Sequence, residues 1–317
     1  MLKIERLNKR FANFTAVSDL DLEVQTGELF GFVGHNGAGK TTTLKIIAGL
    51  LKPTSGHVTI DGSDLEHGKT SYLRKIGYVP DFFGVYDNLK VLEYMEFFAS
   101  MYGLTGKESR RRCLELLELA QLENRPDTYV DTLSRGMKQK LCIVRSLIHD
   151  PDLLLLDEPA SGLDPGARYD LKALLKHLHE EGKTILISSH ILPELSDMCT
   201  SIGIMRGGHL LLQGSMEEIE LQARYDRPLK IRVLAGLEKV RALLREDPQC
   251  TEISWKGNEG TIRYRGNSQD AAGLLEKIIS SGAMLESFYR EKGSLEALFI
   301  DLTKEEDNGQ PERGNHP

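Results

Sequence analysis

The stretch Gly34-His35-Asn36-Gly37-Ala38-Gly39-Lys40-Thr41 decides the fold, because its pattern G-x-x-x-x-G-K-T is that of a phosphate-binding loop. The apolar run 29–33 before it predicts a strand, and residues 41–50 after it have the spacing of a helix. In that setting the glycines let backbone N–H groups approach phosphates, and the helix N-terminus adds favourable partial charge. We expect Lys40 to reach the β- and γ-phosphates and the Thr41 hydroxyl to ligate Mg²⁺.

Length and composition indicate an ordinary soluble globular protein of about two domains. The chain has 317 residues, of which 40% are hydrophobic and 27% charged. Its net charge of −7 and pI near 5.8 argue against a dominant nucleic-acid surface. The basic run Arg110–Arg112 falls in a predicted helix rich in Glu and Leu, so we interpret it as a solvated helix face.

The cysteines and the apolar runs indicate the compartment. Cys113, Cys142, Cys199 and Cys250 are scattered and form no C-x-x-C pair, which argues against a metal site or a disulfide framework and fits a reducing cytoplasm. No apolar run approaches the roughly 18 residues that a membrane span needs. Any role at a membrane is therefore expected to come through another polypeptide.

Two predicted strands end in side chains suited to phosphate chemistry. Residues 153–156 form a continuous apolar strand followed by Asp157 and Glu158. Carboxylates at the carboxyl end of such a strand lie where open α/β sheets bind ligands. Asp157 is suited to hold Mg²⁺ through water, and Glu158 to orient and deprotonate a water. The strand 183–189 ends likewise at His190, which could donate a hydrogen bond to a terminal phosphate.

Two further features are ambiguous when taken alone. Phe11 follows a predicted turn at residues 8–10, and a single aromatic there is more often part of a core than a ligand for a base. The segment Leu133-Ser134-Arg135-Gly136-Met137-Lys138-Gln139 places Ser134 as the N-cap of a helix running to about His149. An ordinary capped helix would explain that pattern without any function.

The pattern changes near residue 227. The sequence predicts, in order, a strand 229–234, a helix 236–246, a hairpin of 251–255 and 260–265, a helix 268–281, a strand 283–289 and a last helix 294–303. The order β-α-β-β-α-β matches the ferredoxin-like unit. It contains no catalytic cluster, so an accessory packing or dimerisation domain is expected. Residues 304–317 are predicted to form a disordered tail.

Taken together, these motifs resemble the ATP-binding subunit of an ABC transporter. The resemblance covers residues 1–220, with the phosphate loop as Walker A, 133–139 as the signature motif and 153–158 as Walker B. Residues 161–164 resemble the D-loop, and His190 the switch histidine. The C-terminal module, ending in 294–303, resembles the accessory domain of ABC-2-type exporter ATPases.

The resemblance implies an α/β fold: a P-loop NTPase cassette over 1–220 with a helical subdomain at about 88–150, and a small α+β ferredoxin-like domain over 221–303. It implies that Glu158 and His190 are catalytic, and that Thr41, Asp157 and Asp81 meet Mg²⁺. The residues implied to bind ATP are Phe11, which falls at the family's adenine-stacking aromatic, and Gly34, His35, Asn36, Gly37, Ala38, Gly39, Lys40, Thr41, Thr42, Ser134, Gly136, Gln139 and Asp157.

Two residues depart from the family pattern. Asp81 stands where Gln is usual; a carboxylate can meet Mg²⁺ or its water, but when ionised it cannot donate a hydrogen bond. Arg135 stands where the first of two signature glycines is usual. Its guanidinium either adds charge near the γ-phosphate or points to solvent.

The function implied is that of a motor subunit that binds and hydrolyses ATP for an exporter. It would form a homodimer, or pair with another ATPase subunit, and drive a separately encoded ABC-2-type permease from the cytoplasmic face of the membrane. An alternative is a soluble ABC protein acting on ribosomes or nucleic acid. The single cassette, the lack of room for a long coiled coil in 41–133 and the acidic pI all disfavour that alternative, and no nucleic-acid partner is expected.

Overall fold

A computed structural model describes residues 1–65, 69–82, 84, 86, 88–225, 228–290 and 298–299, without the side chains of 69 and 222–225. Contacts divide the chain into two compact units, Met1–Met216 and Glu217–Pro317. The predicted helix 294–303 lies outside the described residues apart from 298 and 299, and the predicted tail 304–317 lies wholly outside them.

The first unit contains two sheets. The smaller has the order β2-β1-β4-β5 and consists of β1 (Leu2–Phe11), β2 (Phe14–Val24), β4 (Ser55–Ile60) and β5 (Ser63–Asp64). The larger has the order β10-β9-β3-β8-β7-β6 and consists of β3 (Leu29–Val33), β6 (Ile76–Val79), β7 (Leu153–Leu156), β8 (Thr184–Ser189), β9 (Ser201–Arg206) and β10 (His209–Ser215). All neighbours in the larger sheet are parallel except β10, which runs antiparallel to β9.

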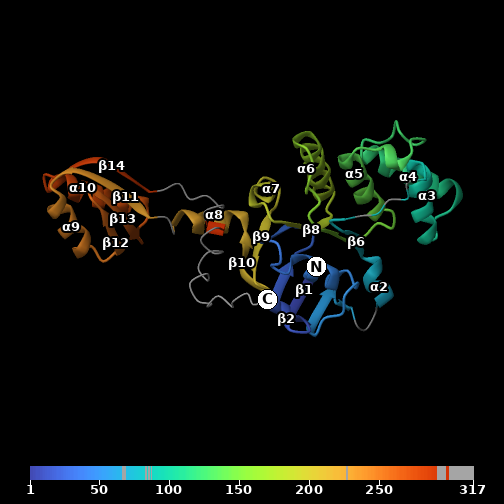
Figure 1. Cartoon of the computed structure of the whole chain (residues 1–317), viewed down its shortest axis with the longest axis horizontal. Coiled ribbons are helices and arrows are strands. Elements are labelled where there is room, and N and C mark those ends of the chain that lie inside the picture. The colour runs from blue at the N-terminus through green and yellow to red at the C-terminus, as the bar shows by residue number, and fades with distance from the viewer. Residues whose placement is uncertain are drawn as a thin grey trace, which may run out of the picture. The chain divides into compact units, whose positions relative to one another are not determined.

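Helices cover the larger sheet on both faces, as expected for a parallel sheet. The helices of this unit are α1 (Lys40–Ile47), α2 (Lys69–Arg74), α3 (Val91–Met101), α4 (Gly106–Leu119), α5 (Arg135–Ser146), α6 (Pro165–Glu180) and α7 (Leu192–Ser196), with a 3₁₀ turn at Val130–Thr132. A further helix, α8 (Met216–Tyr225), begins at the last residue of this unit and continues into the second. Leu44 and Ile47 of α1 share one buried core with Leu153 and Leu155 of β7 and with the inner face of the smaller sheet. The sheet therefore lies between this core and the helices α5 and α6 (Figure 1).

The first hairpin turns later than predicted. The sequence pattern places a turn at residues 8–10, but β1 continues through Phe11 and the turn falls at Ala12 and Asn13. Register shifts interrupt the pairing of β1 with β2 between Ile4 and Arg10. Such irregularities break the alternation of apolar and polar residues, so a continuous strand looks like a strand followed by a turn.

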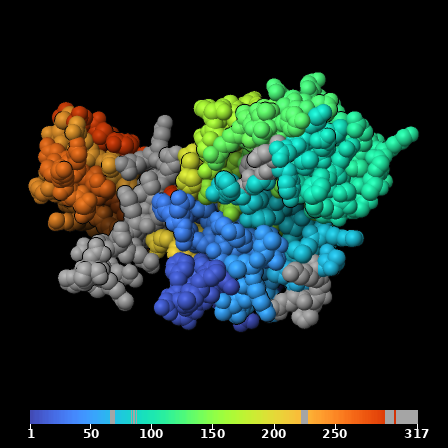
Figure 2. All heavy atoms as spheres, turned by 45° about the vertical axis from the view of Figure 1, so that its right-hand side comes forward, coloured from blue at the N-terminus to red at the C-terminus, as the bar shows by residue number. Residues whose placement is uncertain are grey.

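Three helices, α3, α4 and α5, form a helical layer, which Figure 2 shows as one lobe of the surface (cyan to green). Its assignment as a subdomain at about 88–150 stays a prediction. Leu141 and Val144 on α5 are buried, as predicted. The Ser134 hydroxyl accepts a hydrogen bond from the Met137 N–H (3.3 Å), which confirms the N-cap. However, α5 ends at Ser146 rather than near His149, with Leu147 as its C-cap.

The second unit has the element order predicted from the sequence. It consists of β11 (Leu229–Ala235), α9 (Leu237–Glu246), β12 (Cys250–Lys256), β13 (Glu259–Tyr264), α10 (Ser268–Ser280) and β14 (Met284–Arg290). The strands form an antiparallel sheet in the order β12-β13-β11-β14. Val240 of α9 and Ile278 of α10 pack with Ile231 and Ile262 in a core of its own. Assignment of this unit to the ferredoxin-like class stays a prediction.

Candidate active site

Three neighbouring parallel strands end at the same edge of the larger sheet. The phosphate loop joins β3 to α1, Asp157 follows β7, and Ser189 is the last residue of β8. Because β8 lies between β3 and β7, the three carboxyl ends are adjacent. This is the edge at which open α/β sheets bind ligands.

Two positions in the phosphate loop require glycine for steric reasons. A Cβ on Gly34 would lie 2.4 Å from the Met205 carbonyl oxygen. Gly39 has φ +109°, and its Cβ would lie 2.4 Å from the Ala16 carbonyl oxygen. The loop is therefore held against β2 and β9, and no side chain fits at those two positions. Gly37 (φ +83°) faces open space, on the side where a ligand could approach.

Lys40 is buried and holds the loop together. Its ammonium donates to the carbonyl oxygen of Gly34 (2.6 Å) and lies 3.4 Å from that of His35. It also lies 3.2 Å from Glu158 Oε1, and the side chains of Lys40 and Glu158 are only 5% and 12% exposed. The ammonium thus links the phosphate loop to the carboxylate at the end of the neighbouring strand.

Asp157 is buried beneath the first turn of α1. Its Oδ1 accepts from Thr41 Oγ1 (3.0 Å) and from Ser188 Oγ (2.8 Å). Burial raises the pKa of Asp157, and the negative charges of Glu158 and Asp81 act in the same direction. A carboxylate whose ionised form is disfavoured in this way is stabilised by a cation.

Glu158 lies between Lys40 and His190. His190 Nδ1 is 2.8 Å from Glu158 Oε2, and the His190 backbone N–H donates to the same oxygen (3.3 Å). Glu158 has φ +48°, a conformation that is uncommon for residues other than glycine. Its backbone N–H donates to Ser188 Oγ (3.0 Å), which fixes this turn. The structure therefore brings together the two residues predicted to be catalytic.

Ser188 is the residue at this site that the sequence analysis missed. One hydroxyl contacts both the Asp157 carboxylate and the Glu158 backbone, so it sets the positions of two consecutive acidic residues. The available signal was a polar residue at the end of the otherwise apolar run of β8. Its partner lies 31 positions earlier, and no local pattern reveals that contact.

The remaining predicted ligands lie on other elements. Phe11 ends β1 and is 44% exposed, with the Lys9 ammonium 4.8 Å from its ring centroid. Ser134, Gly136 and Gln139 belong to the start of α5, where a Cβ on Gly136 would meet Ala167 of α6 at 2.5 Å. Gln139 is buried within this packing. The start of α5 therefore packs against α6, and no contact joins Ser134, Gly136 or Gln139 to the phosphate loop among the described residues.

Arg135 is exposed, and its side chain also contacts a neighbouring loop. Its guanidinium lies 2.7–3.0 Å from the position that a Cβ on Gly162 would occupy. Gly162 has φ +66°, so this position favours glycine for two reasons. The side chain of the first residue of α5 thus contacts the loop 161–164.

Comparison with known proteins identifies the class. The ABC transporter family matches residues 17–161. The linearmycin resistance ATP-binding protein LnrL of Bacillus subtilis is 31% identical, over 96% of this chain and 98% of that protein. The chain therefore belongs to the ABC transporter family, as one of its ATP-binding proteins.

One further relative and two solved structures also resemble this chain. The Nod factor export ATP-binding protein I of Ralstonia nicotianae is 37% identical, over 96% of this chain and 94% of its own. The ATP-binding subunit of an ABC transporter superposes with a TM-score of 0.63 at 34% identity, covering 70% of this chain and 92% of that one. A dimeric cassette in a post-hydrolysis state with ADP and Pi gives 0.62 at 29%, covering 68% and 99%. The protein is an ATP hydrolase built on the α/β P-loop fold.

Proposed function

We propose that this protein is the motor subunit of an exporter, which drives a separately encoded ABC-2-type permease by ATP-dependent closure of an ATPase dimer. The observation that carries the proposal is the position of Glu158, held between Lys40 of the phosphate loop and His190. The exporter assignment draws on the names of relatives concerned with Nod factor export and linearmycin resistance.

The residues beside the phosphate loop fit Mg²⁺. Among the described residues, no group of three or more His, Cys, Asp or Glu could hold a metal by itself. Mg²⁺ bound with ATP does not need one, because it takes one or two protein oxygens, several waters and the phosphates. The Thr41 hydroxyl and the Asp157 carboxylate, 3.0 Å apart, would supply those oxygens, and Asp81 would add negative charge nearby. The bound ion would neutralise charge on the phosphates.

Hydrolysis follows from the contacts of Glu158. Its Oε1 pairs with Lys40, and its Oε2 lies against His190. When Lys40 turns to the phosphates, Oε1 is freed to accept a proton from an attacking water. The loop residues 34–39, with Lys40, Thr41 and Thr42, hold the phosphates, and Phe11 stacks on the adenine.

Dimer closure accounts for the ligands that one chain does not assemble. Ser134 caps α5, and Gly136 keeps that helix close to α6. We assign the N-terminus of α5, with Ser134, Gly136 and Gln139, to the nucleotide held by a second cassette. An anionic nucleotide between two helix N-termini favours the closed dimer, and hydrolysis releases it.

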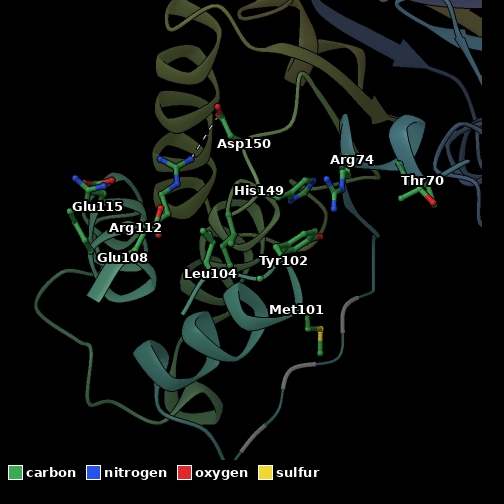
Figure 3. Close-up of a pocket in the computed structure, with 14 residues that line it drawn as sticks. Thr70, Arg74, Met101, Tyr102, Leu104, Glu108, Arg112, Glu115, His149 and Asp150 are labelled. Carbon is green, nitrogen blue, oxygen red and sulfur yellow. Dashed lines mark ion pairs between the residues drawn. The ribbon is translucent and has the colours of Figure 1, made fainter. Parts of the chain in front are cut away.

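The permease would dock on the helical layer. A cleft of about 1000 Å³ lies between α2, the end of α3, α4 and the segment after α5. Figure 3 shows Met101, Tyr102 and Leu104 on one side of it and Arg74 on the other, with His149 between them. Met101 and Tyr102 are 61% and 48% exposed, which is unusual for large apolar groups at adjacent positions. The described residues contain no helix that could cross a membrane, and the proposal assigns the membrane span to the permease.

The protein would then act in the cytoplasm, bound to the inner face of the membrane through its permease. The C-terminal ferredoxin-like unit, proposed to span 221–303 beside a cassette of 1–220, would serve in packing or dimerisation. The test is an affinity pull-down of the tagged chain from gently solubilised membranes. The proposal expects a stoichiometric multi-span membrane protein, and recovery of ribosomes or nucleic acid alone would overturn the transport assignment.

A further inference from the structure

Glu194 is a buried carboxylate that has no role in the proposed mechanism. It lies on the short helix α7, four residues after His190, and is 7% exposed. Its Oε2 accepts from Ser189 Oγ (2.9 Å), and its Oε1 lies 3.3 Å from Arg168 Nε. Burying a carboxylate costs several kcal/mol unless partners compensate, and apolar packing would serve the fold as well. The stability of the fold therefore does not explain why a carboxylate occupies this position.

Ser189 joins Glu194 to the backbone on both sides of the site. Its carbonyl oxygen accepts from the N–H of Gly34, the first residue of the phosphate loop (3.3 Å). Its hydroxyl accepts from the N–H of Ile191, the residue after His190 (3.0 Å). A hydroxyl has one hydrogen, and two acceptors face it: the Glu194 carboxylate at 2.9 Å and the Ile191 carbonyl oxygen at 3.4 Å. The carboxylate is both closer and charged, so we assign the hydrogen to Glu194. Glu194 thus orients the hydroxyl so that its lone pairs face Ile191, and this fixes the backbone that carries His190.

Arg168 connects Glu194 to the loop 161–164. Its Nη2 donates to the Leu163 carbonyl oxygen (3.3 Å) in that loop. At the other end of the loop, the Ser161 N–H donates to the Glu158 carbonyl oxygen (3.0 Å). The Arg135 guanidinium lies against Gly162 of the same loop. A continuous set of contacts therefore runs from the start of α5 through this loop and Arg168 to Glu194.

We propose that Glu194 is a positioning residue for His190, acting through Ser189, and that Arg168 makes this positioning depend on the loop 161–164. The inference rests on the proposed role of His190 in hydrolysis. In a dimer, the loop and the start of α5 would face the second cassette. Closure at that surface would then reach His190 through Arg168 and Glu194.

The test is a double-mutant cycle of ATPase activity in the full chain, with His190→Ala, Glu194→Gln and the combination. A glutamine carries no charge to pair with Arg168, and its NH₂ group must face either Arg168, which has no acceptor, or Ser189, whose hydroxyl then accepts from residue 194 instead of donating to it. We expect Glu194→Gln to lower kcat by about 10-fold to 100-fold, because small displacements of a catalytic group have effects of that size. The KM for ATP is expected to change less than about twofold, and the double variant to be no slower than His190→Ala.

A matched control lies between the same two helices. Lys172 of α6 pairs with Asp197, just after α7, at 3.2 Å, but Asp197 is exposed and does not touch Ser189. Asp197→Asn is expected to leave kcat and KM unchanged. If Glu194→Gln melts below the assay temperature, Ser189→Ala tests the same link while the pair of Arg168 with Glu194 stays intact.

The outcomes separate the two proposals. An unchanged kcat in His190→Ala refutes the role of His190 itself, and with it the basis of this inference. If His190→Ala is slow but Glu194→Gln keeps full kcat, or if the two defects multiply in the double variant, Glu194 does not act through His190. Equal losses in Asp197→Asn and Glu194→Gln would also overturn the inference, because they would indicate a general effect on the helix contact.

Discussion

The buried pair of Lys40 with Glu158 makes a quantitative prediction about the protein without nucleotide. At 3.2 Å, two unit charges attract by about 5 kcal/mol at an effective dielectric constant of about 20. Both groups lose hydration, and each keeps another partner when the pair is broken, Lys40 the Gly34 carbonyl and Glu158 His190. We therefore expect a coupling free energy of about 1–3 kcal/mol between Lys40→Met and Glu158→Gln.

The assay is urea unfolding of wild type, both single variants and the double variant, with the free energy extrapolated to water. Trp255 is the one tryptophan of the chain and lies in β12 of the second unit, so its fluorescence does not report on the first. Unfolding of the first unit should be followed by hydrogen exchange at the amides of β3, β7 and β8. The pair of Lys75 with Asp61, 3.5 Å apart and with side chains 26% and 43% exposed, is the control and should couple by no more than about 0.5 kcal/mol. Coupling at Lys40 and Glu158 as small as in this control would refute the reasoning.

Three further predictions concern single sites. Burial raises the pKa of Asp157 above its unfolded value near 3.8, so its ionisation opposes folding increasingly as the pH rises through and above that value. Asp157→Asn should therefore gain stability over wild type as the pH rises above about 3.8 in thermal melts without Mg²⁺, and a difference that does not change with pH would contradict this. Ser134→Ala should cost about 1 kcal/mol of unfolding free energy by removing the cap of α5. Burial raises the pKa values of Cys142 and Cys250 to about 11, and it also raises those of Cys113 and Cys199. Labelling of the four thiols by a disulfide reagent at pH 7.5 should therefore be slow until urea unfolds the chain. Rapid labelling of the native protein would contradict this prediction.

The sequence predicted the fold and the edge that carries the site because both follow from local patterns. Strand 29–33, the phosphate loop and the helix that follows form one continuous stretch, and the carboxyl ends of parallel strands must share an edge. Asp157, Glu158 and His190 could be assigned to that edge from their positions directly after apolar runs.

Local sequence patterns do not predict contacts between segments that are distant in the chain. Ser188 meets Asp157 across two strands, and Glu194 meets Arg168 across two helices, so only the packed structure reveals them. The turn after β1 was misplaced because bulges disturb the alternation on which strand prediction depends. For Arg135, the sequence left two environments open, and the structure adds a contact with Gly162 that neither of them includes.

The role of Glu158 in hydrolysis and dimer closure is tested most directly by comparing wild type and Glu158→Gln in one experiment with Mg²⁺ and ATP. Sedimentation velocity reports the association state, and phosphate release reports turnover. If Glu158 takes the proton from water, the variant should bind ATP, accumulate as a dimer and hydrolyse about 10²–10⁴-fold more slowly than wild type. A variant that hydrolyses ATP at the wild-type rate, or that stays monomeric while saturated with ATP, would contradict the account.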